Sequence, residues 1–365
     1  SFCELISRLP HDIHVELALL QSDNIHLRDS KILVNVNHEK LNLDSFFFHY
    51  KFKGKYNLYH WLSENLPFFH SVDRINKRLS IKKLIEGKFD VFHPTGFSTY
   101  FLPYLNGKPY IYTVHDMTCD LFPVSKGMMR QALNIKLLAQ NAAHVIAVSY
   151  NTKEDLMRLT KIPDQKITVI HHGAPNIERI TGKRIIASPY FLYVGARHSY
   201  KNFASVLDCM QVFVKTHPEV KLVCTGANFS RVEIKLIDKY RLHESLIHYF
   251  ANDTQLKNLY ANAIAFVYPS LYEGFGMPIL ESFSYGCPVL LNKKSCFPEI
   301  GGNAAIYFNS DSYGSNMYEA FEKVYSFSEQ ERNTQVEKGY NRLNLFSWKR
   351  SAEQLAQVYR NIANR

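Results

Sequence analysis

One stretch in the second half of the chain, residues 263–291, constrains the fold more than any other. An apolar segment from Ala263 to Tyr268 predicts a strand, and a turn with two glycines follows it. Pro278 then favours the start of a helix, because the amide that proline lacks would be unsatisfied there in any case. A second apolar strand is expected to begin near Cys287. Strand, turn, helix and strand in this order form the repeating unit of a parallel α/β sheet.

The turn of this unit predicts an anion site. The amides of Phe275, Gly276 and Met277 would point out of the positive end of the helix, which favours phosphate. Glu273 before the helix and Glu281, expected in its first turn, flank that position. Such carboxylates suggest recognition of sugar hydroxyls, because one carboxylate can accept hydrogen bonds from two neighbouring hydroxyls. The alternative is a solvated loop, since acidic residues are ordinary in a first turn.

Short apolar segments and helical segments alternate along most of the chain. This alternation predicts mostly parallel sheets with right-handed crossovers. Strands are expected over residues 13–20, 31–36, 89–94, 110–116, 144–148 and 167–170, and then over residues 190–194, 221–224, 247–250, 264–268, 288–291 and 305–308. Helices are expected over about residues 65–86, 128–141 and 151–159 (with an N-cap region at Asn151), and in the tail from about residue 328.

The chain is long enough for two domains. Its 365 residues exceed what one hydrophobic core usually supports. The periodicity lapses between Pro175 and Ser188, which predicts a linker over residues 177–188. We therefore expect one α/β domain over residues 1–176, a second over residues 189–346 and a terminal helix over residues 347–365. Two facing sheets would place a ligand cleft between the domains.

The loop after the first strand of the second domain carries two cations. Gly195 opens this loop, and Arg197 and Lys201 follow four residues apart. Both would face the cleft, where a diphosphate suits the fork of Arg197 and the point charge of Lys201. A solvated Lys201 at a helix start is the alternative. His115, at the end of another expected strand, is either a structural or a catalytic histidine, and its spacing alone favours the structural role.

The net charge and the motifs of the chain limit the classes of binding partner that we expect. The net charge of +10 suits nucleic acid, an anionic membrane surface or a phosphorylated small molecule. Nucleic acid is the least favoured, because no Cys/His finger, ribonucleoprotein signature or basic-zipper pattern is present. Aromatic residues alternate with lysines over residues 46–56, which suits a lipid headgroup layer or a half-buried strand, and the alternation favours the strand.

No run of about 18 apolar residues predicts a membrane span. The first residues carry charge too early for a secretory signal, so we expect a cytoplasmic protein. The six cysteines lack the close spacing of a zinc site and are expected to be buried thiols.

Together these residues resemble the retaining glycosyltransferases of family 4, which have the GT-B fold of two facing Rossmann-like domains. The E-x7-E signature of that family matches Glu273 to Glu281 with Gly-Phe-Gly-Met-Pro between them. Arg197 and Lys201 match the basic pair on the donor diphosphate. His115, in Val-His-Asp-Met, matches the active-site histidine of the first domain.

The resemblance implies an N-terminal acceptor domain, a C-terminal donor domain and a terminal helix that crosses back to the first domain. Glu281 would bind the nucleotide ribose, and Glu273 the hydroxyls of the transferred sugar. Gly195, Gly274, Phe275, Gly276 and Met277 would complete the donor site. Residues 90–94 and 115–117 look most like mannosyltransferases of bacterial surface polysaccharide assembly, such as lipopolysaccharide synthesis.

The reaction implied is transfer of a hexose from a GDP- or UDP-linked donor to a saccharide or lipid-linked acceptor, with retention of configuration. No Asp-x-Asp motif is present, so neither a metal ion nor another cofactor is expected. Anionic membrane contact would suit a lipid-linked acceptor. The alternatives are a nucleotide-sugar epimerase of the same fold and an inactive nucleotide-sugar-binding subunit. Family members usually begin with a strand and a Gly-Gly loop, whereas Ser1 to Pro10 resembles the middle of the following helix, so we expect that strand and loop to be absent.

Overall fold

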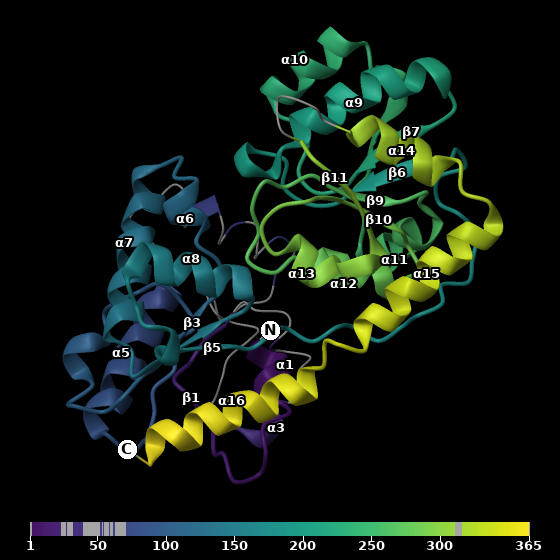
Figure 1. Cartoon of the computed structure of the whole chain (residues 1–365). Helices are drawn as coiled ribbons and strands as arrows, with labels where there is room; N and C mark the ends of the chain where they lie inside the picture. Colours follow the sequence, from purple (N-terminus) through teal and green to yellow (C-terminus); the bar gives the residue numbers. More distant parts are fainter. Residues whose placement is uncertain are drawn as a thin grey trace.

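We describe the protein from a computed structural model, in which two α/β domains lie side by side (Figure 1). The structure describes residues 2–22, 27, 32–38, 52, 54, 58, 61–62, 71–310 and 316–364. The aromatic and lysine-rich segment, residues 46–56, lies outside the described residues apart from residues 52 and 54.

The C-terminal domain is built on a six-stranded sheet in which every neighbouring pair of strands is parallel. Nearly all side chains of its central strands are buried, as expected for strands covered by helices on both faces. The strands are β6 (Tyr190–Tyr193), β7 (Lys221–Cys224), β8 (Leu246–His248), β9 (Phe266–Tyr268), β10 (Val289–Asn292) and β11 (Ala305–Phe308), in the order β11-β10-β9-β6-β7-β8.

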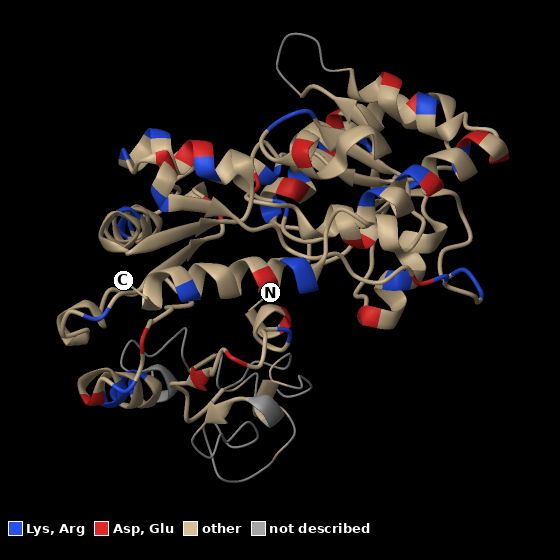
Figure 2. Cartoon of the chain, turned by 60° about the horizontal axis from the view of Figure 1, so that its bottom comes forward, with Lys and Arg blue, Asp and Glu red and all other residues tan. Residues whose placement is uncertain are grey.

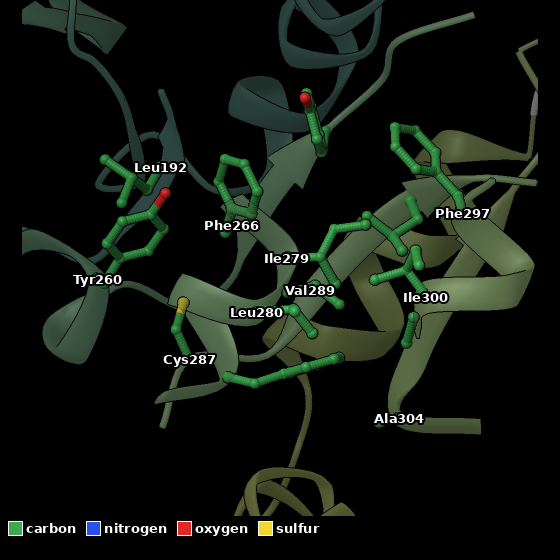
Figure 3. Packing of buried hydrophobic residues seen from close by; sticks show 14 of the residues in the cluster. Leu192, Tyr260, Phe266, Ile279, Leu280, Cys287, Val289, Phe297, Ile300 and Ala304 are labelled. Carbon is green, nitrogen blue, oxygen red and sulfur yellow. The ribbon is translucent and has the colours of Figure 1, made fainter. Parts of the chain in front are cut away.

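Two sets of helices cover this sheet, each through its own apolar cluster. Figure 3 shows side chains of α12 and α13 packed against β6, β9 and β10. One face carries α9 (Phe203–Thr216), α10 (Arg231–Tyr240) and α14 (Met317–Tyr325), and the other carries α11 (Asp253–Asn262), α12 (Met277–Ser284), α13 (Phe297–Gly301) and α15 (Glu329–Leu343).

The strand order brings two distant loops together. Strands β6 and β9 are neighbours, with Leu192 opposite Phe266, although three helices and two strands separate them in the chain. The order of strands reverses here, and ligands of open α/β sheets bind beyond the carboxyl ends of strands at such a point. The loops that follow β6 and β9 therefore line one site.

The N-terminal domain contains a smaller parallel sheet of β3 (Ile111–Val114), β4 (His144–Ala147) and β5 (Ile167–Val169). A single bridge between Phe92 and Tyr110 adjoins it. The other described elements of this domain are β1 (Glu16–Leu17), paired with β2 (Asn37–His38), the helices α1 (Phe2–Ile6), α3 (Ile32–Asn35), α5 (Ser71–Glu86), α6 (Thr118–Leu121), α7 (Lys126–Asn141) and α8 (Tyr150–Thr160), and the 3₁₀ turns η1 (Leu102–Tyr104) and η2 (Asp164–Lys166). The 3₁₀ turns of the C-terminal domain are η3 (Ser199–Lys201), η4 (His243–Ser245) and η5 (Gly302–Ala304).

Three expectations for this domain need correction. The apolar run expected as a strand over residues 31–36 forms helix α3, because a run this short does not distinguish a strand from a helix. The strand expected over residues 89–94 is reduced to the bridge at Phe92. The N-cap of α8 is Ser149 rather than Asn151, and its Oγ accepts a hydrogen bond from the amide of Thr152.

The last helix, α16 (Trp348–Ala363), runs along the N-terminal domain (Figures 1 and 2). Its apolar face packs on strand residues of that domain, with Leu355, Val358 and Ile362 in one cluster with Ile111 and Ile146. This helix therefore ties the end of the chain to the first sheet. None of the helices in the described ranges is both long and apolar enough to cross a membrane.

Candidate active site

The loops after β6 and β9 meet through an ion pair. Lys201, the last residue of η3, places Nζ 2.6 Å from Oε1 of Glu273, which lies 72 residues later. Both side chains are less than one fifth exposed, at 18% and 14%. The structure thus brings together a cation and a carboxylate that the sequence predicted separately, at the reversal point of the sheet.

Two further residues hold Glu273, and the sequence pattern indicated neither. Tyr268 lies beside its carboxylate, and burial, followed by the charge of Glu273 and a hydrogen bond to it, raises the pKa of Tyr268 well above its ordinary value. The phenol therefore stays protonated and donates to the carboxylate. The amide of Glu273 donates to Ser295 Oγ at 3.2 Å, and the same hydroxyl donates to the Glu273 carbonyl at 2.7 Å.

Helix α12 begins beside this pair. Gly276 is its N-cap, with φ of +88°. Met277 is the first helical residue and Pro278 the second, so the helix starts one residue earlier than expected. In the described part of the chain, no group accepts a hydrogen bond from the amides of Phe275, Gly276 or Met277. These amides and the positive helix end are available to an anion.

Glu281 is the fifth residue of α12 and lies in its second turn, not the first turn as expected. Burial, with a smaller contribution from Asp253, raises the pKa of its carboxyl group. Among the described residues, none donates a hydrogen bond to its carboxylate. A partly buried carboxylate without a donor is costly, which indicates a position that a ligand with hydroxyl groups would satisfy.

Arg197 occupies a different position from the one expected. Its side chain is only 3% exposed, and its guanidinium donates to Glu233 Oε1 at 3.0 Å and to three backbone carbonyls. It also lies over the ring of Phe229, 4.8 Å from the centroid. Four of its five N–H groups are therefore engaged within the protein, so Arg197 holds the loop that follows β7 instead of presenting a free fork to the cleft.

His115 lies in the N-terminal domain at the domain boundary, where its carbonyl oxygen contacts Gly274. Its ring stacks on that of His172, with centroids 5.7 Å apart, and meets the edge of Phe2 at 5.8 Å. Burial lowers the pKa of His115, and the neighbouring carboxylate of Asp116 opposes that shift only partly. The imidazole is therefore neutral near pH 7, so one ring nitrogen can donate a hydrogen bond and the other can accept one.

Gly274 joins the two domains. A Cβ on this residue would lie 1.7 Å from the carbonyl oxygen of His115, so only glycine permits the contact. The carbonyl oxygen of Gly274 accepts hydrogen bonds from the hydroxyls of Ser149, at 2.6 Å, and Thr152, at 3.2 Å. The loop that carries Glu273 is thus fixed by the start of α8, across the domain boundary.

Glu299 makes a second tie between the domains, which sequence reasoning missed. Its carboxylate accepts hydrogen bonds from the amides of Tyr150 at 2.8 Å and Asn151 at 3.2 Å, the first two residues of α8. His171 Nε2 lies 2.6 Å from the same carboxylate. A carboxylate is well placed at the positive end of a helix, but nothing in the sequence pattern pairs α8 with α13.

Within the described ranges, no group of three His, Cys, Asp or Glu side chains is arranged to hold a metal ion. The positive groups beside Glu273 are Lys201 and the amides at the start of α12. Together they could stabilise a diphosphate, while the two glutamates could bind neighbouring hydroxyls.

Comparisons with known proteins match both halves of the chain. The family model described as Glycosyltransferase Family 4 matches residues 47–175, and the model described as Glycosyl transferases group 1 matches residues 179–342. The O-antigen chain mannosyltransferase RfbU of Salmonella typhimurium is 31% identical over 209 residues, which cover 54% of this chain and 56% of that protein. The match therefore spans little more than half of that relative. O-antigen chain mannosyltransferase B of Escherichia coli is 25% identical over 266 residues, or 68% of this chain and 69% of that protein.

Among solved structures, Anabaena HepE in complex with UDP and glucose superposes with a TM-score of 0.68 at 15% identity, covering 98% of this chain and 94% of that one. The likeness in fold confirms the expected pair of facing α/β domains. Because two family models match consecutive parts of the chain and the fold is shared, the chain belongs to the glycosyltransferases that have a Glycosyltransferase Family 4 domain followed by a Glycosyl transferases group 1 domain, and it has the GT-B fold.

Proposed function

We propose that the protein transfers a hexose from a nucleotide diphosphate sugar to a hydroxyl of a saccharide or lipid-linked glycan, with retention of configuration. The observation that carries this proposal is the Lys201–Glu273 pair beside the amides at the start of α12, which donate to no described residue, at the reversal point of the sheet. The curated relatives described as O-antigen chain mannosyltransferases support mannose as the sugar.

The donor diphosphate would bind at the N-terminus of α12 and beside Lys201. Glu281, which lacks a described hydrogen-bond donor, would accept hydrogen bonds from the ribose hydroxyls. Glu273, oriented by Lys201 and Tyr268, would accept from hydroxyls of the transferred sugar. We assign Arg197 the role of holding the loop that follows β7, because its guanidinium is already engaged by Glu233 and backbone carbonyls of that loop.

In the proposed reaction, the bond between the anomeric carbon and the leaving phosphate oxygen breaks as the acceptor oxygen bonds to the same face of that carbon. The acceptor proton passes to the departing phosphate oxygen. Lys201 and the α12 amides stabilise the charge that grows on this phosphate, and each well-aimed donor contributes ~3 kcal/mol. Neutral His115 orients the sugar from the opposite domain.

Neither a metal ion nor a cofactor is required by this proposal, because Lys201 and the helix amides supply the positive charge. We therefore expect full activity with a GDP- or UDP-linked donor in the presence of EDTA. Strict dependence on added divalent metal would contradict this part of the mechanism.

We also propose peripheral contact with an anionic membrane on the cytoplasmic side, where a lipid-linked acceptor would be reached. The net charge of +10 supports this contact. Nucleic acid is not proposed as a partner.

The test begins with a screen of nucleotide sugars for thermal stabilisation, because a ligand at about a hundred times its dissociation constant adds ~2.7 kcal/mol to stability. The donor identified is then incubated with the protein, with water as the acceptor, and both nucleotide release and the configuration of the sugar first formed are measured by NMR. Release with retention supports the proposal. Conversion of the sugar without nucleotide release would indicate an epimerase, and stabilisation without either would indicate a binding subunit.

A further inference from the structure

The outer face of α7 carries an exposed apolar stripe. Met129, Leu133 and Leu137 are 54%, 67% and 44% exposed. Residues four apart lie on one face of a helix, so these three form a continuous line. Val124, just before the helix, is 65% exposed. Figure 1 shows α7 on the outer side of the N-terminal domain, away from the C-terminal domain.

The opposite face of α7 is buried, so the stripe is not a misplaced core face. Its inward residues are completely or almost completely buried and pack in the N-terminal domain. They are Ala132, Ile135, Leu138 and Ala139. The helix is therefore apolar on both sides, and only one of these sides has a partner within the described protein.

Cations flank the exposed stripe. Helix α7 contains Lys126, Arg130 and Lys136 and no acidic residue. Lys136 pairs with Asp120 at 2.7 Å, whereas Lys126 and Arg130 are exposed and form no ion pair with a residue that the structure describes. Apolar side chains bordered by unpaired cations are the composition expected of a helix that lies in the interface of an anionic bilayer.

The segment before α7 is fixed to the candidate active site. The ring of Phe122 lies 5.6 Å from that of Tyr200 and 6.0 Å from that of Tyr272, which belong to the two loops that carry Lys201 and Glu273. A surface that binds α7 would therefore also position the segment that contacts these two loops.

We propose that this face of α7 docks on an anionic lipid bilayer, with Met129, Leu133 and Leu137 in the headgroup layer and Lys126 and Arg130 against lipid phosphates. The proposal rests on the proposed function in one respect: docking would bring the cleft to a lipid-linked acceptor. A second copy of this chain is a poorer occupant, because two α7 faces would bring like charges together.

The experiment is co-sedimentation of the full chain with vesicles of phosphatidylcholine, with and without phosphatidylglycerol. We expect binding that requires phosphatidylglycerol and weakens with salt. Leu133→Asp should weaken it roughly tenfold or more, because it removes apolar contact and adds a repelled charge. Lys126→Gln with Arg130→Gln should weaken it by about 25-fold, at about fivefold for each cation.

Helix α10 supplies matched controls. Val232 is 70% exposed, and Lys235 and Lys239 are exposed cations, but Glu233 and Asp238 lie on the same helix. Val232→Asp and the double change Lys235→Gln with Lys239→Gln should leave vesicle binding unchanged. Equal losses in the α7 and α10 variants would show a nonspecific charge effect and overturn the proposal.

Two other outcomes would also overturn it. Equal binding to vesicles with and without phosphatidylglycerol would remove the role of the cations. A dimer in solution that Leu133→Asp dissociates, without any vesicle binding, would assign the face to self-association. Donor hydrolysis in solution should be the same in every α7 variant. If the parental protein did not hydrolyse the donor, that result would count against the proposed function, but it would not change the conclusion about vesicle binding.

Discussion

At the scale of single residues, the Lys201–Glu273 pair shows how a donor site can be organised before the donor binds. The ammonium group neutralises a carboxylate that would otherwise repel a diphosphate, and Tyr268 donates a hydrogen bond to the same carboxylate. Because both partners of the ion pair are largely shielded from water, their geometry is well defined. Each residue type was predicted from the sequence, but their direct contact depends on the order of the strands.

Replacing Lys201 with Ala should lower turnover by about a hundredfold or more, since it removes a cation aimed at the leaving phosphate. The donor turnover of the variant is measured at saturating donor. Lys153→Ala is the matched control, because it breaks an ion pair with Asp164 at 2.7 Å on the surface of α8. Near-normal turnover in Lys201→Ala would remove this residue from the proposed mechanism.

Glu281→Gln should change donor affinity and stability in opposite directions. Loss of a charged hydrogen-bond acceptor should weaken donor binding by ~1.5 to 3 kcal/mol. The raised pKa of Glu281 means that its charged form is disfavoured in the folded protein, so removal of the charge should raise the melting temperature without ligand near pH 7. Calorimetry and thermal unfolding measure the two effects. Unchanged affinity would exclude contact with the ribose.

Arg197 shows the limit of prediction at this scale. Its position after β6 predicted a side chain near the cleft, and the family resemblance assigned it to the diphosphate. The partners that engage it, Glu233 and the carbonyls of Thr225, Ala227 and Asn228, lie 28 to 36 residues later and become neighbours only when β7 pairs with β6. A residue's type and spacing do not show which of several acceptors folding will bring to it.

At the scale of elements, the start of α8 links domain closure to the geometry of the donor loop, which is the loop between β9 and α12 that carries Glu273. Its N-cap Ser149 contacts the carbonyl of Gly274, and its first two amides bind the carboxylate of Glu299. One contact comes from the loop that carries Glu273 and the other from helix α13. Movement of α8 away from that domain would therefore release both the donor loop and α13.

Glu299→Ala should favour a more open arrangement of the domains, because two helix amides and His171 lose their acceptor. A lost hydrogen bond to a charged group costs about 1.5 to 3 kcal/mol. We expect a larger radius of gyration by small-angle X-ray scattering and a lower kcat, with nearly unchanged donor affinity. Loss of affinity to the same extent as kcat would instead indicate direct contact with the donor.

Glu331→Ala is the control for this change. Glu331 caps α15 within the C-terminal domain by accepting hydrogen bonds from the amide and hydroxyl of Ser328. Its replacement should lower stability slightly without changing the radius of gyration. If both variants gave the same scattering curve as the parental protein, Glu299 would have no role in closure.

The elements themselves were predictable to different degrees. The apolar strands of the C-terminal domain were found because burial on both faces makes their sequences continuously hydrophobic. The run over residues 32–35 was assigned wrongly, because three consecutive apolar residues suit either a strand or one helical turn. The tie between α8 and α13 had no signal in the pattern, since it depends on how the two domains meet.

At the scale of the whole molecule, two buried histidines lie where separate parts of the chain meet. The ring centroid of His172 lies 4.9 Å from that of Phe275 in the donor loop and 5.6 Å from that of Trp348 in α16. His93 joins the first sheet to α16, with its ring nitrogens 2.7 Å from the Tyr359 hydroxyl and 2.9 Å from Thr113 Oγ1. Burial lowers the pKa of each to about 3. Both imidazoles are therefore neutral in the folded protein, whereas the unfolded chain protonates them near pH 6.5.

The assembly of the two domains and α16 should consequently weaken as the pH falls below about 6.5, because the unfolded state then binds protons that the folded state does not. Each histidine should remove ~1.4 kcal/mol of unfolding free energy per pH unit until its folded pKa is reached. Urea unfolding between about pH 7 and pH 5 measures this slope before most carboxylates titrate. His93→Asn with His172→Asn should flatten it, while replacement of His243, an exposed histidine, should not. A slope that stays the same in the double variant would show that other groups cause the loss of stability in acid.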